Sequence, residues 1–165
     1  MSKEQETKKQ FAIQKLYVKD ASFESPGTPN SFSFKKWDPK IDLNLTNNQR
    51  HLEGDLYEVV LCITATVTHE ESTVFLIEVQ QAGLVAMTGF DEAEKKYLLG
   101  SQCMNIMFPY AREVVSDLSV RGGFPPLILS PVNFDALYQQ HLQQQAEQAD
   151  GAQEDSAQEE AEVTH

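Results

Sequence analysis

The chain has 165 residues, with 13 Lys and Arg against 25 Asp and Glu, so its formal net charge is −12. This length suits one domain with a substantial hydrophobic core. The charge argues against nucleic acid as a partner, because no basic stripe is available to neutralise phosphates. An anionic membrane surface would repel the chain for the same reason, so we expect basic partners and no stable membrane insertion.

The negative charge is concentrated near the C-terminus. No Lys or Arg follows Arg121, whereas seven of the acidic residues lie from Gln143 onward. That segment has no aromatic residue and buries too little apolar area to offset its chain entropy. The sequence therefore predicts a disordered N-terminus over 1–10, a folded domain over 11–142, and a helix end with an acidic disordered tail over 143–165.

Neither a leader segment nor a spanning apolar run is visible in the sequence. The two cysteines, Cys62 and Cys103, form no C-x-x-C motif and suggest no disulfide framework. A reducing cytoplasm is therefore the expected location.

Strand patterns fill the first half of the chain. Residues 11–19 are rich in aromatic and β-branched types, and this strand is expected to end near Asp20. Residues 40–46 alternate between apolar and polar, as a half-buried strand does. Residues 56–68 and 73–85 predict a long antiparallel hairpin with a short turn between them.

The second strand of this hairpin has two different faces. Phe75, Ile77 and Val79 lie on one face. Leu76 and Glu78 lie on the other, where apolar residues alternate with acids and amides. Such a mixed face either is solvated or forms an interface.

Helix patterns follow Gly89. We expect a first helix over 92–105 and a second that has Pro109 in its first turn and runs to about Val120. A last helix is expected to begin around 131–133, with one apolar face formed by Phe134, Leu137, Tyr138, His141 and Leu142. Strands followed by helices indicate an α+β fold with an antiparallel sheet.

The residues that could carry chemistry form no recognisable site. No His has a Cys, His or carboxylate partner at metal-ligand spacing, so neither a metal nor a cofactor is expected. Cys103 is either a nucleophile or a small buried apolar residue, and no local motif supports the nucleophile. We expect a protein that is not an enzyme.

Apolar residues in the predicted loops and at the helix junction allow two interpretations. They include Phe32, Phe34, Trp37, Met104, Met107 and Phe124. They either form ordinary core beneath long loops or line an apolar groove that accepts varied apolar segments.

Five stretches give the chain a resemblance to the SecB family of bacterial protein-export chaperones. They are IQKLYVKDASFESP (13–26), LYEVVL (56–61), FLIEVQQAG (75–83), NIMFPYARE (105–113) and SPVNFDAL (130–137). Their order and spacing span nearly the whole predicted domain, and FPYARE and SPVNFDAL are the most specific among them.

The resemblance implies a four-stranded antiparallel sheet with helices packed on one face, and a homotetramer built as a dimer of dimers. It implies a chaperone that binds unfolded precursor proteins without ATP, keeps them translocation-competent and delivers them to the SecA motor of the Sec pathway. An alternative within the same family likeness is a SecB-like chaperone dedicated to one partner, such as a toxin–antitoxin system.

The resemblance also implies roles for individual residues. The SecA-binding positions correspond to Asp20, Glu24, Leu76 and Glu78, and the C-terminal helix and tail correspond to a second SecA contact. The client-binding groove corresponds to Tyr17, Trp37, Phe124 and Tyr138. Where the family commonly has Cys-Pro-Asn, this chain has Met104 in place of the proline, which bears on where the middle helices divide.

Overall fold

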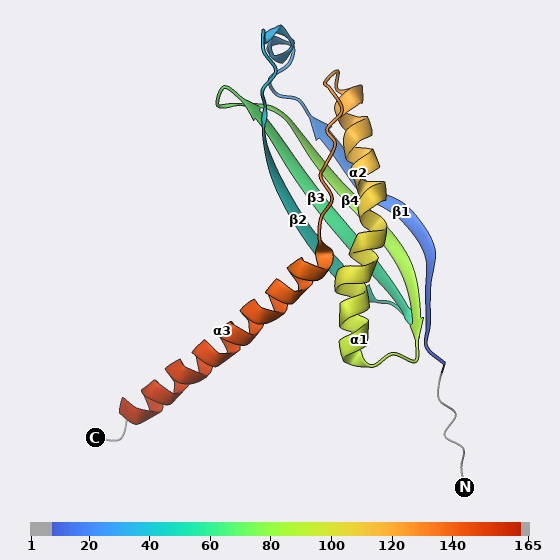
Figure 1. Ribbon diagram of the computed structural model, residues 1–165, viewed down its shortest axis with the longest axis vertical. Coiled ribbons are helices and arrows are strands. Elements are labelled where there is room, and N and C mark those ends of the chain that lie inside the picture. The colour runs from blue at the N-terminus through green and yellow to red at the C-terminus, as the bar shows by residue number, and fades with distance from the viewer. Residues whose placement is uncertain (1–7, 163–165) are drawn as a thin grey trace.

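A four-stranded antiparallel sheet forms the body of the protein, in the spatial order β1-β4-β3-β2 (Figure 1). The computed structural model describes the backbone of residues 8–162 and the side chains of residues 8–150. Residues 1–7, on which most of the predicted N-terminal disorder falls, lie outside the described residues. The strands are β1 (Gln10–Glu24), β2 (Lys40–His51), β3 (Leu56–His69) and β4 (Ser72–Thr88).

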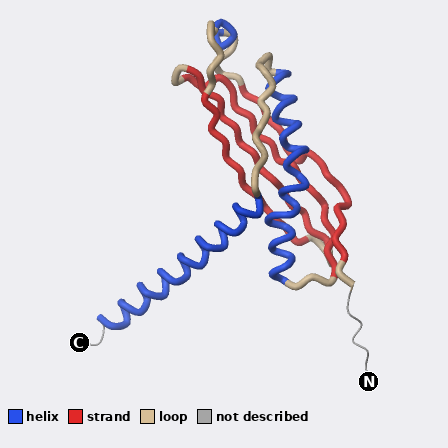
Figure 2. Tube along the Cα trace, in the orientation of Figure 1, coloured by secondary structure: helices blue, strands red, loops and turns tan. Residues whose placement is uncertain are grey.

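Apart from a 3₁₀ helix (Asn30–Ser33) in the loop before β2, the described helices lie on the same side of this sheet (Figures 1 and 2). They are α1 (Glu92–Tyr97), a π-helical turn (Leu98–Gln102), α2 (Cys103–Arg121) and α3 (Phe134–Glu162). α1, α2 and the loop 122–133 run along the sheet, whereas α3 projects away from it. We call the covered side the helix face and the opposite side the open face. The predicted fold class is confirmed.

The β3–β4 hairpin follows its predicted alternation. Alternate β3 residues from Val59 to Val67 are at most 1% exposed and lie on the helix face, as do Phe75, Ile77 and Val79 of β4. The turn between the strands has positive φ at Glu70 (49°) and Glu71 (63°), a geometry that suits tight hairpins. Leu76 and Glu78 consequently lie on the open face.

β1 is longer than the sequence predicts. It continues past Asp20 to Glu24, paired with β4 throughout, and has irregularities in register between Ile13 and Lys15 and between Val18 and Asp20. A bulge adds one residue to a strand and breaks the two-residue alternation. The pattern therefore changes phase twice, which hid the second half of this strand from a search for regular alternation.

β2 also exceeds its predicted length. Asn47 to His51 pair with Leu61 to Tyr57 of β3 and extend the strand to the turn. β2 is an edge strand, and most of its residues are exposed. Its second half is therefore polar and lacks the apolar positions by which a strand is recognised.

The predicted division of the middle helices is wrong. Pro109 lies inside α2 rather than in a first turn, and α2 runs without interruption from Cys103 to Arg121. Proline removes the bond to the carbonyl four residues earlier, which belongs to Asn105. Asn105 is exposed, so water can satisfy that carbonyl. The irregularity occurs earlier, in the π-helical turn Leu98–Gln102, within the predicted first helix.

α3 begins at Phe134, where the Asn133 side-chain oxygen accepts a 3.0 Å hydrogen bond from the Ala136 N–H. The structure has helix from there to Glu162, whereas the sequence predicts a helix end and a disordered tail from residue 143. The segment is rich in Gln, Ala and Glu, which are good helix formers. Its local preference is therefore helical although it has no apolar stripe to bury.

The largest fully buried side chain of the core is Phe75. It is 1% exposed, and its ring centroid lies 5.5 Å from that of Phe23 on β1 and 4.8 Å from that of Phe124 in the loop after α2. It therefore joins an edge strand, a central strand and the loop over the helix face.

We expect Phe75→Ala to lower the free energy of unfolding by about 3–5 kcal/mol, because it removes a fully buried ring and leaves a cavity. Phe32→Ala is the control, since Phe32 is 56% exposed, and it should cost about 1 kcal/mol or less. Urea unfolding at fixed protein concentration measures both. Equal shifts for the two variants would contradict this view of the core.

Candidate functional site

An acidic patch lies on the open face along β1 and β4. It consists of Asp20, Glu24, Leu76 and Glu78, the four residues for which the sequence predicts SecA binding. Glu24 pairs directly with Leu76, and Glu78 pairs with Ser22, between Glu24 and Asp20 on the same strand. Cross-strand partners share a face of a sheet, so the structure brings all four together.

The carboxylates of the acidic patch are free to meet a partner. Asp20, Glu24 and Glu78 are exposed, and within residues 8–150 none of them forms an ion pair or a side-chain hydrogen bond. Leu76 is half-buried at the end of the patch nearest the β3–β4 turn, beside Glu24. Three solvated carboxylates with one apolar side chain next to them make a surface complementary to a basic protein.

Beside the acidic patch, the open face carries a buried carboxylate that sequence reasoning missed. Glu58 accepts hydrogen bonds from the Tyr17 hydroxyl, from Lys19 Nζ at 2.7 Å and from Arg50 at 3.3 Å. Only 11% of its side chain is exposed. These donors come from both edge strands, so the group, which we call the Glu58 cluster, ties β1 and β2 to β3.

Hydrogen bonding and burial shift the pKa values in this cluster. Hydrogen bonds from Lys19 and Tyr17 hold the pKa of Glu58 below its ordinary value. Burial, followed by the hydrogen bond to this carboxylate, raises the pKa of Tyr17 to about 12. Glu58 is therefore ionised, and Tyr17 neutral and donating, near neutral pH.

Aromatic side chains gather where the loop 25–39 meets the loop after α2. Trp37 stacks on Phe124, with ring centroids 5.7 Å apart, and on His69 at 5.9 Å. Phe32 packs on Phe124 at 5.2 Å. Phe124 is buried, whereas Trp37 and Phe32 are 36% and 56% exposed. This aromatic cluster unites two of the four predicted groove residues.

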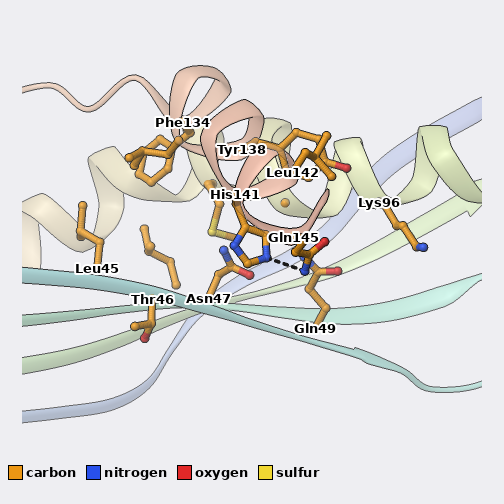
Figure 3. Close-up of a pocket in the computed structure, with 14 residues that line it drawn as sticks. Leu45, Thr46, Asn47, Gln49, Lys96, Phe134, Tyr138, His141, Leu142 and Gln145 are labelled. Atoms are coloured by element: carbon orange, nitrogen blue, oxygen red, sulfur yellow. Dashed lines mark hydrogen bonds between the residues drawn. The ribbon is translucent and has the colours of Figure 1, made fainter. Parts of the chain in front are cut away.

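Tyr138 lies elsewhere, in a cavity of about 620 Å³ between the start of α3, β2 and the π-helical turn (Figure 3). Leu45 and Gln49 line it from β2, and His141 from α3. Its walls mix apolar side chains with amides, as suits a peptide segment more than a purely apolar ligand.

Tyr17, the fourth predicted groove residue, belongs to the open face. Its ring lies beside β4, with Ala82 as its cross-strand partner, and its hydroxyl is held by Glu58. The structure thus places the four predicted groove residues in three separate surroundings.

The loop residues divide between the two interpretations drawn from the sequence. Met104 and Met107 are at most 1% exposed and belong to the core, as ordinary packing requires. Trp37 and Phe32, together with Ile128 at 72% exposed, remain open to solvent. An apolar surface is therefore available, but it is smaller than the sequence alone suggests.

Cys103, which the sequence leaves as a possible nucleophile, is fully buried. Burial raises the pKa of the Cys103 thiol to about 12, so it stays protonated and unreactive at neutral pH. Among the described side chains, no three His, Cys, Asp or Glu residues gather closely enough to hold a metal ion. None of the described helices is both long and apolar enough to cross a membrane.

The attachment of α3 depends on a glycine. Asp135 accepts hydrogen bonds from the hydroxyls of Ser101 and, at 3.0 Å, Tyr97. Next to these, Tyr138 lies directly over Gly100, where a Cβ would come within 2.9 Å of the ring. The close approach of α3 to the π-helical turn therefore requires a residue without a side chain at position 100.

We expect Gly100→Ala to displace Tyr138 and loosen the first turns of α3, seen as faster amide hydrogen exchange at residues 134–142. In a Tyr138→Ala background the same substitution should have little further effect, since the clashing ring is gone. If Gly100→Ala acted equally in both backgrounds, the contact with Tyr138 would not be what this glycine protects.

A family model and two curated relatives of this chain point to the same protein family. The family model described as "Preprotein translocase subunit SecB" matches residues 4–145. The protein-export protein SecB of Methylococcus capsulatus is 54% identical over 151 residues, covering 89% of this chain and 97% of the relative. That of Hydrogenovibrio crunogenus is 52% identical over 144 residues, covering 87% and 96%.

A solved structure shares the fold at much lower sequence identity. It is the SecB-like chaperone of Mycobacterium tuberculosis in complex with a peptide from the HigA1 antitoxin. Its TM-score is 0.64 at 19% identity, covering 74% of this chain and 90% of that one. The likeness concerns the sheet and helices described above.

Proposed function

The chain belongs to the SecB family of protein-export chaperones, and from this premise we propose that it hands preproteins to SecA through the acidic patch. Preprotein binding, a cytoplasmic location and the lack of an enzymatic activity follow from the family. Delivery to SecA and assembly into a homotetramer, a dimer of dimers, are the parts of the function that we propose.

The acidic patch is the observation that carries this proposal. Its carboxylates are exposed and unpaired among the described residues, and they lie on adjacent positions of β1 and β4 on one face of the sheet rather than scattered. Opposite charges steer a basic partner and set its orientation, and the apolar side chain of Leu76 beside them excludes water from part of the contact. A basic surface on SecA is the partner that fits.

Client holding requires neither catalysis nor a single deep site. The aromatic cluster and the Tyr138 cavity are separate surfaces, and each offers only moderate apolar area. Several weak contacts hold one long unfolded segment well, because each bound part keeps the rest at high effective concentration. Binding of the unfolded form opposes folding by mass action.

Exposed apolar side chains on α2 are the observation that supports the proposed homotetramer. Ile106, Tyr110 and Val120 are 36%, 52% and 52% exposed in the isolated chain. A helix with apolar residues directed away from its own core fits packing against another copy.

A chaperone dedicated to one toxin–antitoxin partner is the alternative. The structural likeness to the antitoxin-bound chaperone is at 19% identity and concerns the fold alone. Relatives whose sequences are 54% and 52% identical to this chain are protein-export proteins. This similarity favours a general export role. Capture of several unrelated unfolded preproteins supports that role, whereas capture of one client only would support the alternative.

We expect the triple variant Asp20→Lys, Glu24→Lys and Glu78→Lys to weaken SecA binding by roughly tenfold or more at low salt, because attraction becomes repulsion. Isothermal titration with purified SecA measures this effect. The control reverses three exposed carboxylates outside the patch, Glu53→Lys, Glu71→Lys and Glu92→Lys, with the same change in charge. Equal losses for the two triples would show a general charge effect and contradict docking at this patch.

We expect Trp37→Ala and Tyr138→Ala each to weaken capture of an unfolded preprotein by about three- to tenfold. Their effects should multiply, because they lie in separate clusters. Leu52→Ala, at an exposed apolar position in the β2–β3 turn, is the control and should leave capture unchanged. Light scattering should show the tetramer mass in every variant. If either aromatic variant dissociated instead, its role would be structural.

A further inference from the structure

The open face carries groups of opposite charge in two regions. Towards the β3–β4 turn it carries the acidic patch. Towards the other end it carries Lys15, Lys19 and Arg50, which we call the basic pole, around the single carboxylate of Glu58. Lys15, Leu84, Glu58 and Arg50 form one row across the four strands, so the basic pole spans the sheet from edge to edge.

Two of the three cations of the basic pole are held in place by hydrogen bonds. Lys19 and Arg50 are both hydrogen-bonded to Glu58, although their side chains are 42% and 66% exposed. Glu58 itself is held by the Tyr17 hydroxyl. The two cations are thus positioned before any partner arrives, which lowers the entropic cost of a contact.

Positive charge remains after this pairing. One carboxylate faces two cations, and Lys15 is exposed, with no ion pair among the described residues. Lys15 donates no hydrogen bond to Glu58, so its charge takes no part in holding that carboxylate. The basic pole therefore has charge left for an outside partner.

The bulge in β1 brings the two poles into contact. Lys19 is the extra residue between Val18 and Asp20, which pair with consecutive residues of β4. Lys19 donates a hydrogen bond to Glu58, while Asp20 pairs with Gln80. Two consecutive residues of opposite charge therefore both have their side chains on the open face. The acidic patch and the basic pole are thus halves of one continuous surface.

We propose that the basic pole is a second half of the SecA-docking face, and that it binds an acidic part of the SecA surface and so sets the orientation of docking. This inference rests on the proposed function. A partner with complementary charges can bind a docking face with two poles in one orientation only, because the reversed orientation places like charges together.

A polyanion is a poorer fit to the basic pole. The chain has a net charge of −12, and the acidic patch adjoins the basic pole directly, so phosphates would be repelled as they approached. An acidic protein segment that reaches the basic pole once the acidic patch has docked avoids this cost.

The test is the double variant Lys15→Glu and Arg50→Glu, which leaves Lys19, Tyr17 and Glu58 in place. We expect SecA affinity to fall by roughly tenfold at low salt, with a smaller fall at high salt. A uniformly basic SecA surface predicts the opposite sign, because the variant adds negative charge. Unchanged or tighter binding would therefore overturn the proposal.

The matched control is Lys35→Glu with Lys36→Glu, which makes the same change in charge at exposed positions in the loop before β2. It should bind SecA as the natural chain does, and a tenfold loss here would show that the effect is not local. Light scattering and preprotein capture establish that each variant is assembled. If the glutamates prevented assembly, Lys15→Gln with Arg50→Gln should still weaken binding about threefold, and no loss would overturn the proposal.

Two further outcomes separate this inference from the proposed function. If reversal of the acidic patch leaves SecA binding unchanged, docking at the open face itself fails. If that reversal weakens binding while the Lys15 and Arg50 variants do not, only the basic pole fails. Binding of the natural chain to phosphatidylglycerol vesicles or to single-stranded DNA, lost in Lys15→Glu with Arg50→Glu, would assign the basic pole to a polyanion instead.

Discussion

Packing of α2 against β3 and β4 is the interaction on which the rest of the structure depends. Met104, Met107, Ala111 and Val115 of α2 meet the fully buried side chains of the hairpin and form one apolar layer. Side chains of a strand alternate between its faces. Burial of the apolar set therefore forces the remaining residues of β3 and β4, Glu58 and Glu78 among them, onto the open face. The surface proposed for docking is thus a direct consequence of how the core is packed.

This arrangement separates the proposed tasks of the molecule. The aromatic cluster and the Tyr138 cavity lie on the side of the helices, whereas the acidic patch and the Glu58 cluster lie on the open face. A bound client and a bound motor can then occupy different faces of the same sheet. Tyr17 lies apart from Trp37 and Tyr138, and its hydroxyl donates a hydrogen bond to Glu58 on the open face.

Sequence reasoning succeeded where structure is local and regular. The β3–β4 hairpin alternates strictly, so its turn and both of its faces could be predicted, and with them the positions of Leu76 and Glu78. It failed where regularity is broken or where polar residues form the element. Bulges hid the second half of β1, the exposed edge hid the end of β2, and Pro109 suggested a break that the solvated Asn105 makes unnecessary. The Arg50–Glu58 pair could have been found by counting back from the β2–β3 turn, since the two residues are direct partners.

The sequence by itself determined the family, the α+β class, the buried face of the hairpin and an acidic character, because these depend on composition, motifs and short-range alternation. Only the tertiary structure decided which charges meet. Lys19 reaches Glu58 across β4, and Tyr138 reaches Gly100 from a helix that begins more than thirty residues later. Both contacts depend on how distant segments pair and pack, and a one-residue bulge changes which side chains share a face. That strand register cannot be predicted from the local pattern of the sequence.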